Sequence, residues 1–370
     1  KSKMNLDFSN IKVLLIGDFM IDHYIIGTSK RMSPETSQVP VVLPKEEYSI
    51  PGGAGNVAMN MCVFAGQKSY RDNMYFEGKP FIFCVGAVGH DKMGNELLSI
   101  LKGGTIRKDF ESDGTIEFIH YHDQIDISNI IKGDLPMYDS MDPRSIHDKF
   151  RGYIETTVKE RTYLNDKQIY RLDRERLLNQ SYNEDLNNLI TKNIIGKDIV
   201  VLSDYNKGVL NEITIPHILS EAKKNKIPVI IDPKKDDFTL YEGADIITPN
   251  LNELNRASKT DINDDKSIIE TCNKLIEKHN FNFILAKRGK RGISIVGKNN
   301  FVKQIQAHAV DNPDVTGAGD TVIASFSLAY AKLGDVELAA KIANAAASIV
   351  VSKKGTAVVE TKEIESLFTK

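Results

Sequence analysis

The chain has 370 residues, which allows one large domain or two ordinary ones. Hydrophobic residues make up 41% of it, and 48 Lys and Arg against 50 Asp and Glu give a net charge of −2, so no nucleic-acid partner is expected. The longest apolar runs, such as residues 13–16, are far shorter than the roughly 20 residues of a membrane helix. The first residues also lack the apolar core of a signal peptide, so we expect a cytoplasmic protein with no membrane partner.

The cysteines and histidines do not indicate a metal centre. Cys62, Cys84 and Cys272 form no C-x-x-C pair, and we interpret them as buried core thiols. His120 and His122 lie in an alternating segment, where both would point to the same face of a strand. We interpret this pair as exposed strand residues, with a metal site as the alternative.

Short apolar runs recur along the chain and predict strands. Their continuous rather than alternating hydrophobicity is typical of strands that are covered by helices on both faces. The runs are residues 12–17, 81–85, 198–202, 227–232, 245–248 and 283–286. Intervening segments such as residues 211–225 and 262–279 are long and amphipathic enough for crossover helices. This alternation predicts an α/β fold with a parallel sheet.

Two regions interrupt the alternation and predict a small β-rich lid. Residues 22–50 hold an extended pattern with Ser-Pro and Val-Pro steps that disfavour helix, and residues 115–173 hold alternating stretches at 116–122 and 168–172. About residues 123–151, the sequence is polar and lacks apolar periodicity, so we interpret this part as a surface insertion.

The segment with the most specific chemistry is D-V-T-G-A-G-D at residues 314–320, followed by residues 321–330, which predict a buried helix. Glycines ahead of a helix let bare backbone N–H groups converge on an anion, where the helix dipole is positive. Asp320 would then lie in the first turn beside that anion. An aspartate can also simply cap a helix, but a cap does not require two glycines flanking an alanine. The segment therefore predicts a phosphate site with an adjacent carboxylate.

A second glycine cluster, P-G-G-A-G-N at residues 51–56, also runs into a predicted helix. It makes either a tight turn or an open backbone that a polyhydroxylated ligand can approach, with Asn56 as donor and acceptor. Asp18 and Asp22 follow the first strand, at the carboxyl edge where open α/β sheets bind ligands, and they either bind sugar hydroxyls or cap turns. A P-loop and a Rossmann glycine motif are both missing from the sequence, since G-K-R-G at residues 289–292 has the wrong spacing and is expected to turn between two strands.

Asn250 and Glu253 follow another predicted strand, within T-P-N-L-N-E at residues 248–253. Three positions apart, they would share a helix face and could hold Mg²⁺ or its waters, since this ion prefers few protein oxygens and several waters. The alternative is a helix N-cap with an acidic third position.

Three motifs together carry a resemblance to a known family. They are G-G with Asn56 near the N-terminus, V-G-A-V-G-H-D-K-M-G at residues 85–94, and the segment 314–320. In this order and spacing, the chain resembles the ribokinase-type, or PfkB, carbohydrate kinases. The resemblance implies a ribokinase-like three-layer α/β sandwich with a central, mostly parallel sheet and the small lid, over residues 11–370. It also implies a phosphotransferase that uses ATP and Mg²⁺ and acts on an alcohol group of a sugar.

The resemblance implies a role for each matching position. Asp320 would accept the proton of the sugar hydroxyl as the general base, and backbone N–H groups of Gly317, Ala318 and Gly319 would hold the transferring phosphoryl group. The residues implied to bind the sugar are Asp22, Gly52, Gly53, Asn56, Arg171 and Asp173.

Further positions are implied for the nucleotide and for metal ions. Those for the nucleotide and its phosphates are Lys207, Lys234, Asn250, Glu253, Lys287, Gly289 and Asn344, and Asn250 and Glu253 would hold Mg²⁺ through water. Asp314 and Thr316, with carbonyls near Lys354 and Gly355, resemble the family's monovalent-cation site, which would take K⁺.

Within the family, the chain is most similar to the kinases of D-glycero-β-D-manno-heptose 7-phosphate. This similarity implies phosphorylation of the anomeric hydroxyl to give the 1,7-bisphosphate. It rests on residues 17–24, 31–35, 170–173, 202–208 and 231–234. The alternatives are a kinase for another sugar, sugar phosphate or nucleoside, and a non-catalytic sugar sensor, although a sensor would not need both a base and an anion site.

A sugar phosphate brings about two negative charges, so its far end is expected to meet cations on the lid. The candidates are Arg31, Lys159, Arg161 and Arg171. The resemblance also implies a homodimer joined through the lids and a kinase domain without the nucleotidyltransferase domain that some of these kinases carry.

Overall fold

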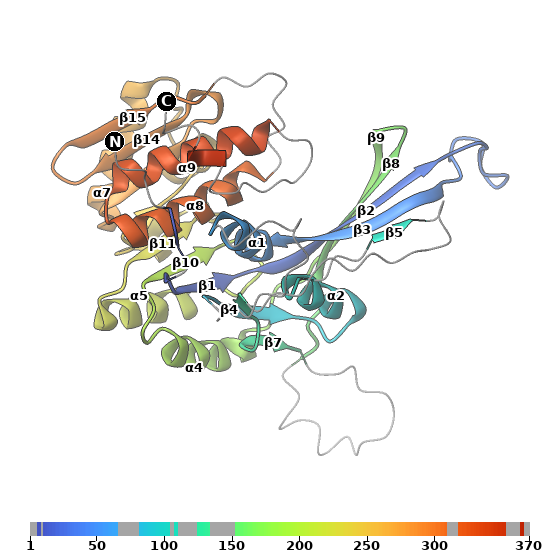
Figure 1. The fold of residues 1–370 in the computed structure, drawn as a ribbon, viewed down its shortest axis with the longest axis horizontal. Coiled ribbons are helices and arrows are strands. Elements are labelled where there is room, and N and C mark those ends of the chain that lie inside the picture. Colours follow the sequence, from blue (N-terminus) through green and yellow to red (C-terminus); the bar gives the residue numbers. More distant parts are fainter. Residues whose placement is uncertain are drawn as a thin grey trace, which may run out of the picture.

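A mostly parallel sheet forms the centre of the molecule (Figure 1). The computed structural model describes residues 6–8, 10–65, 81–103, 107–109, 124–133, 152–308, 317–352 and 363–365. The strands of this sheet are β1 (Val13–Gly17), β4 (Ile82–Val88), β6 (Ile125–Asp126), β7 (Ile130–Lys132), β10 (Ile199–Ser203), β11 (Val229–Asp232), β12 (Ile246–Ile247), β13 (Phe283–Lys287), β14 (Ile293–Gly297) and β15 (Phe301–Ile305). Their order is β15-β14-β13-β12-β11-β10-β1-β4-β6, with β7 also paired to β4. Neighbouring strands pair in parallel, except that β14 pairs antiparallel with both β13 and β15.

Helices cover both faces of the sheet, because alternate residues of its strands are apolar on both sides. Leu15 of β1 points into one core, with α1 (Ala54–Phe64), α2 (Lys92–Leu101), α8 (Ala318–Leu333) and α9 (Val336–Val351). Leu14 points into the other core, with α4 (Asn183–Asn193), α5 (Thr214–Asn225), α6 (Leu251–Ser258) and α7 (Asp265–His279). The predicted three-layer sandwich is confirmed.

The expectation for the cysteines is confirmed: Cys62, Cys84 and Cys272 are all buried, as core thiols should be. Among the described residues, no helix is both long enough and apolar enough to cross a membrane.

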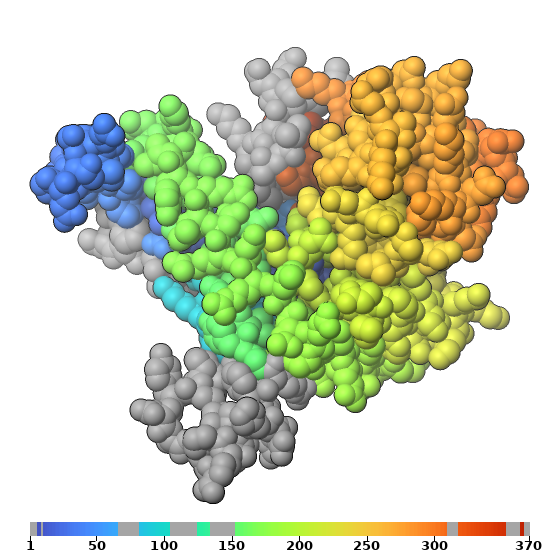
Figure 2. All heavy atoms as spheres, turned by 180° about the vertical axis from the view of Figure 1, so that it is seen from behind, coloured from blue at the N-terminus to red at the C-terminus, as the bar shows by residue number. Residues whose placement is uncertain are grey.

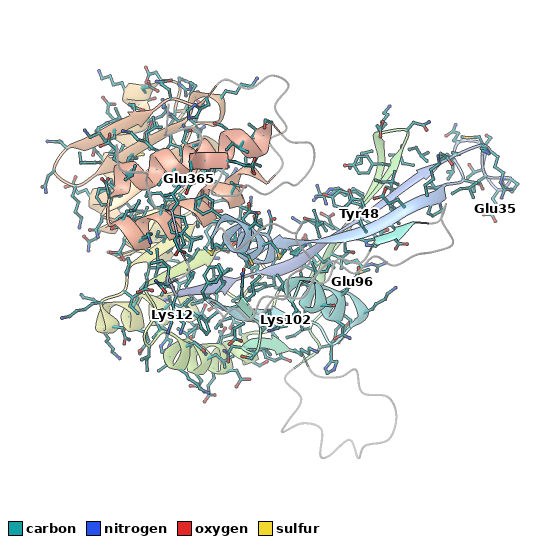
Figure 3. The ribbon with its side chains drawn as sticks, viewed as in Figure 1. Lys12, Glu35, Tyr48, Glu96, Lys102 and Glu365 are labelled. Carbon is teal, nitrogen blue, oxygen red and sulfur yellow. The ribbon has the colours of Figure 1, made fainter. Side chains whose placement is uncertain are left out.

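A second sheet forms the lid and projects from the sandwich (Figures 1 and 2). Its strands are β2 (Phe19–Thr28), β3 (Leu43–Gly53), β5 (Arg107–Asp109), β8 (Thr157–Leu164) and β9 (Lys167–Arg174), in the order β5-β3-β2-β8-β9. Only Asp18 separates β1 from β2, so the lid is rooted at the carboxyl end of a central strand. Tyr48 lies along the lid and Glu35 at its outer tip (Figure 3). The predicted β-rich lid is present.

The predicted surface insertion at about residues 123–151 is wrong for residues 124–133. These residues form β6 and β7, which pair in parallel with β4, and Ile125 and Ile130 are buried. The two strands are so short that their apolar residues show no periodicity in the sequence. The rest of the insertion, the strand predicted at residues 116–122 and its two histidines lie outside the described residues.

Candidate active site

The glycine-rich start of α8 leaves backbone N–H groups open to a ligand. Gly317 is the N-cap residue, with φ of 75° in the left-handed region that favours glycine, and among the described contacts no side chain caps the helix. The N–H of Thr321 donates to the Gly317 carbonyl at 3.2 Å, so the N–H groups before it have no partner inside the helix. A Cβ atom at Gly319 would lie 3.5 Å from Lys287 Nζ. The N–H groups without a partner inside the helix and this ammonium lie where the predicted anion site requires them.

Asp320, in the first turn of α8, is buried and accepts two hydrogen bonds from other elements. Asn56 Nδ2 of α1 donates to Oδ2 at 2.8 Å, and the Tyr205 hydroxyl donates to Oδ1 at 2.8 Å. Burial raises the pKa of Asp320 to about 6, as does the charge of Asp232, whereas the two hydrogen bonds and Lys287 lower it. The carboxylate is therefore ionised at neutral pH and is a stronger proton acceptor than an exposed aspartate.

A polar network joins α1 to α8 and fixes this carboxylate. Asn60 Nδ2 donates to the Asn56 side-chain oxygen at 3.2 Å and to the Asn56 carbonyl at 2.8 Å. The Thr321 hydroxyl in turn donates to Asn60 Oδ1 at 2.9 Å. Because the Asn56 oxygen is occupied, its amide nitrogen faces Asp320. The predicted sugar ligand Asn56 thus also orients the predicted base.

A cavity of about 550 Å³ adjoins the start of α8, the size of a small-molecule site. It brings together six residues predicted from the sequence: Asn250, Lys287, Gly289, Ala318, Gly319 and Asn344. Ile293, Val322, Ala347 and Val351 supply an apolar wall. The cavity can accept a flat apolar group, with an anionic end at the α8 N-terminus.

Asn250 and Glu253 form the capping box that the sequence left as an alternative. Asn250 Oδ1 accepts from the Glu253 N–H at 2.8 Å, and Glu253 Oε1 accepts from the Asn250 N–H at 2.9 Å. Burial raises the pKa of Glu253. Both side chains therefore hold the start of α6 at the mouth of the cavity, with Asn250 in its lining.

Lys287 is the cation at the centre of an acidic group. Its Nζ lies 3.0 Å from Asp232 Oδ1, and although burial lowers the pKa of Lys287, the charges of Asp232 and Glu253 raise it more. Lys234 adds a second positive charge near Glu253. With Asp320, three carboxylates thus face two ammonium groups. In the described part of the chain, no cluster of three His, Cys, Asp or Glu side chains has the geometry of a metal site.

One face of the lid turns charged side chains toward the start of α8. In the register of β8 with its neighbours, Lys159 lies directly opposite Asp22 and Asp173, and Arg161 lies opposite Arg171. All five side chains are on one face of the lid sheet. Lys159 Nζ lies 5.9 Å from the centre of the Tyr205 ring, whose hydroxyl bonds Asp320. The predicted sugar-binding residues of the lid therefore lie above the predicted base.

Most of these charges pair with one another. Arg161 donates to Asp22 at 3.1 Å, Arg171 makes two bonds to Asp173 at 2.8 and 3.0 Å, and Lys207 Nζ lies 2.6 Å from Glu175. Lys159 is half-buried, and its pKa is lowered by burial and by the charges of Arg171 and Lys207, although Asp22 and Asp173 raise it. Of Lys159, Arg161 and Arg171, Lys159 is the cation without an ion pair among the described contacts.

The two predicted glycines are required by close packing. A Cβ atom at Gly52 would lie 2.9 Å from Asp22 Oδ2, and one at Gly53 would lie 2.3 Å from the Asp18 carbonyl oxygen. Gly53 also has φ of 56°. They allow β3 to turn into α1 directly beneath Asp22.

A family model described as "pfkB family carbohydrate kinase" matches residues 159–362, more than half of the chain. The chain belongs to the pfkB family of carbohydrate kinases. It is therefore a phosphotransferase that acts on a sugar hydroxyl.

Curated relatives of this pfkB-family chain carry the name bifunctional protein HldE. The chain is 33% identical over 356 residues to that of Sulfurimonas denitrificans, covering 96% of this chain and 63% of the relative. It is 32% identical over 369 residues to that of Granulibacter bethesdensis, covering 98% of this chain and 65% of the relative. The chain thus spans less than two thirds of the length of these relatives.

Solved structures share the ribokinase-like fold. Arabidopsis thaliana ribokinase in complex with ribose and ATP aligns with a TM-score of 0.62 at 18% identity, covering 97% of this chain and 99% of that one. Escherichia coli phosphofructokinase-2 in complex with potassium aligns with a TM-score of 0.66 at 16% identity, covering 97% and 98%. At these identities the likeness shows the fold.

Three residues of this pfkB-family site differ from the sequence interpretation. Asp18 is 2% exposed and accepts hydrogen bonds from backbone N–H groups of the loop after β10, as the alternative interpretation of it as a turn residue predicts. Tyr205 and Asp232 were not predicted as site residues. Asp232 ends β11 at the same edge where β1 and β10 end, a position that marks ligand sites in α/β sheets. Tyr205 lies two residues after the end of β10, at the same edge.

Two sets of predicted residues lie elsewhere. Arg31 is exposed in the loop between β2 and β3, at the end of the lid that is remote from its root. Asp314, Thr316, Lys354 and Gly355, the predicted monovalent-cation site, lie outside the described residues.

Proposed function

We propose that this pfkB-family kinase transfers a phosphoryl group from ATP to the anomeric hydroxyl of D-glycero-β-D-manno-heptose 7-phosphate, giving the 1,7-bisphosphate. The observation that carries the proposal is the position of Asp320. It lies between an anion site with an adjoining ligand-sized cavity on one side and the cationic face of the lid on the other. The HldE relatives support the choice of sugar.

Asp320 is the general base in this proposal. Above pH 6 its carboxylate is ionised, and it accepts the proton of the anomeric hydroxyl as the oxygen attacks phosphorus. Because the phosphoryl transition state is loose, positioning and charge stabilisation supply most of the rate. The N–H groups at the start of α8 and Lys287 Nζ stabilise the equatorial oxygens of the transferring group.

ATP fits the cavity beside α8, with its base against the apolar wall and its phosphates toward Gly319. The negative excess of Asp232, Glu253 and Asp320 over Lys287 and Lys234 suits a hydrated divalent cation bound with the nucleotide. Such a Mg²⁺ ion would neutralise phosphate charge, held through water by Asn250 and Glu253. Asp314 and Thr316 remain the candidates for K⁺.

The sugar phosphate lies under the lid in this proposal. Its 7-phosphate binds the cations of the β8–β9 face, foremost Lys159, and its hydroxyls bind Asp22, Asp173 and Asn56. A doubly charged phosphate compensates Lys159 and competes for the exposed Arg171, so the far end of the ligand gains charge-assisted hydrogen bonds. The enzyme works in the cytoplasm, where ATP is supplied, and as a homodimer joined through the lids.

The test is an ATP-consumption screen with heptose 7-phosphate, heptose, ribose, fructose 6-phosphate and adenosine as acceptors. We expect the highest kcat/KM with heptose 7-phosphate and a product phosphorylated at the anomeric position, as read by ³¹P NMR. Preference for another acceptor overturns the substrate assignment but leaves a sugar kinase. Binding of the sugar, with no phosphorylation of any acceptor, favours a sugar sensor.

A further inference from the structure

Tyr205 occupies the junction between the lid, the core and Asp320. It lies in the loop that follows β10, and its hydroxyl donates to Asp320 Oδ1 at 2.8 Å. Lys159 Nζ of the lid and Lys234 Nζ of the core lie 5.9 and 5.8 Å from the centre of its ring. One ammonium group of the lid and one of the core thus lie over the ring, and the hydroxyl of the ring contacts the Asp320 carboxylate.

The buried carboxylate of Asp18 fixes the backbone that carries Tyr205. Asp18 Oδ2 accepts the N–H of Tyr205 at 2.8 Å and that of Lys207 at 3.3 Å, and Oδ1 accepts the N–H of Val209 at 3.3 Å. Because Asp18 connects the central strand β1 to the lid strand β2, it anchors the loop at the root of the lid. Asp18 therefore fixes the backbone that carries Tyr205, and the hydroxyl at the end of this side chain contacts Asp320.

The hydrogen bond from Tyr205 is one of the interactions that set the pKa of Asp320. Burial and Asp232 on β11 favour the neutral acid, whereas Lys287 on β13 and the donors Asn56 and Tyr205 favour the carboxylate. Burial raises the pKa of Tyr205 well above its ordinary value, and the charge of Asp320 raises it further, so the phenol keeps its proton. Tyr205 is a permanent donor and cannot serve as the acceptor of the sugar proton.

We propose that Tyr205 is a positioning residue of the kinase, whose hydroxyl holds the Asp320 carboxylate ionised and in the orientation that receives the sugar proton. This inference rests on the proposed role of Asp320 as general base. Asn56 alone cannot replace Tyr205, because it donates to Oδ2 of Asp320. Without the Tyr205 hydroxyl, the carboxylate of Asp320 could rotate and its Oδ1 could take a proton.

Removal of the Tyr205 hydroxyl has consequences that differ from those of a packing defect. A hydrogen bond to a buried charged group is lost, so kcat falls about 10- to 100-fold. The acid limb of the kcat profile moves to higher pH, because Asp320 protonates more easily. KM for ATP stays constant, since Tyr205 does not line the 550 Å³ cavity.

The first experiment compares Tyr205→Phe with Tyr170→Phe, steady-state rates being measured with heptose 7-phosphate from pH 5 to 9. Tyr170 lies on β9 of the lid and is 52% exposed, so it is a matched control with an expected wild-type profile. A fall in kcat with an acid limb shifted up by about one pH unit supports the proposal. A fall in kcat without that shift marks Tyr205 as a packing residue and overturns it, as does an unchanged kcat.

The second experiment needs no sugar substrate and separates this inference from the proposed function. The carboxyl carbons of aspartate are labelled with ¹³C, and the Asp320 signal is assigned by its loss in Asp320→Asn. In Tyr205→Phe this signal is expected to titrate at higher pH than in the wild type, and an unchanged midpoint overturns the inference. If Asp320→Asn retains wild-type turnover, the base assignment fails, whatever the titration shows.

Discussion

The two sides of Asp320 are built in opposite ways. On the core side, Asp320 and Asn56 are 8% and 7% exposed, and buried hydrogen bonds tie α1, α8 and the loop after β10 together. On the lid side, the Arg171 and Asp173 side chains are 44% and 34% exposed and pair with each other across a solvated face. Exposed ion pairs contribute only about 0–1 kcal/mol, so a ligand can displace them at little cost, whereas a buried network cannot be rearranged cheaply.

This difference separates two tasks. In the proposed function, the core side presents a fixed base and a fixed anion site, which is what phosphoryl transfer to any hydroxyl requires. The lid side presents charges that can change partners, and these can select a sugar phosphate. Changes on the core side should therefore lower kcat strongly, and changes on the lid side should raise KM for one substrate.

The largest effect is expected from Asp320→Asn. The amide keeps the size of the side chain but cannot accept the proton, so kcat should fall by roughly 10²- to 10⁴-fold, with KM for the sugar little changed. Steady-state kinetics measure both parameters. Near-normal turnover in this variant would remove Asp320 from the mechanism.

Gly319→Val tests the anion site. The branched side chain would stand where the phosphate approaches the backbone, beside Lys287, so turnover with ATP should fall by about 10²-fold or more. Gly319→Ala is the graded control, because among the described residues a Cβ atom there meets Lys287 Nζ alone, at an ordinary 3.5 Å. Both variants should keep the wild-type circular dichroism spectrum. Unchanged ATP kinetics in a folded Gly319→Val protein would contradict the site.

Alanine variants of Lys159, Arg161 and Arg171 test the lid side. Loss of a phosphate contact should raise KM for heptose 7-phosphate by about 5- to 150-fold and leave KM for ATP unchanged. The effect should be largest for Lys159, which makes no ion pair among the described contacts, whereas Arg161 and Arg171 do. Arg31→Ala is the control, since Arg31 lies in the outer loop of the lid. Equal activity on heptose and its 7-phosphate, with no variant selectively impaired, would sink the sugar-phosphate assignment.

The outer lid also predicts an assembly. Met32, Val39 and Leu43 are 49%, 50% and 49% exposed near its tip, and such apolar side chains favour burial against a partner. Light scattering at micromolar concentration should give twice the mass of one chain, and Val39→Asp with Leu43→Asp should halve it. A wild-type monomer would count against the lid-mediated dimer.

The same contrast explains how much of the molecule could be predicted from its sequence. Continuous apolar runs marked central strands such as β10 within one or two residues, because burial on both faces leaves an unbroken pattern. The short strands β6 and β7 leave no pattern, so the sequence predicts an insertion where they lie. Local motifs likewise identified the start of α8 and its glycines.

Contacts between distant segments could not be predicted in this way. Asp18 and Asp22 look alike in sequence, but one is buried under a loop and the other faces the lid charges. Tyr205 and Asp320 lie 115 positions apart, and no spacing rule connects them. The chemistry of a helix start is local, whereas the partners that tune its carboxylate depend on the whole fold.

The smallest expected effect is that of Asp320→Asn on stability. It sharpens the comparison because the substitution should raise stability while it lowers activity. Burial raises the pKa of Asp320 from its ordinary value of 3.8 to about 6. Between these values the folded chain binds more protons than the unfolded chain, so stability falls as pH rises through this window. Above pH 6 the buried charge then costs on the order of 3 kcal/mol.

Asp320→Asn removes this charge and gives up part of the gain, because its amide has one acceptor oxygen in place of two, so Asn56 and Tyr205 cannot both keep their hydrogen bonds. We expect a net gain of about 1–2 kcal/mol and a Tm a few degrees higher than the wild type at pH 7.5, shrinking toward pH 4, where the wild-type carboxyl is protonated in the folded chain and so no longer a buried charge. Asp261→Asn, at an exposed position, is the control. Differential scanning calorimetry at both pH values measures the difference. A variant that is less stable than the wild type at pH 7.5, or equally stabilised at pH 4, would mean that the buried charge of Asp320 does not destabilise the fold. The contrast between a core side whose buried charge lowers stability and a lid side whose exposed ion pairs have little effect on it would then be wrong.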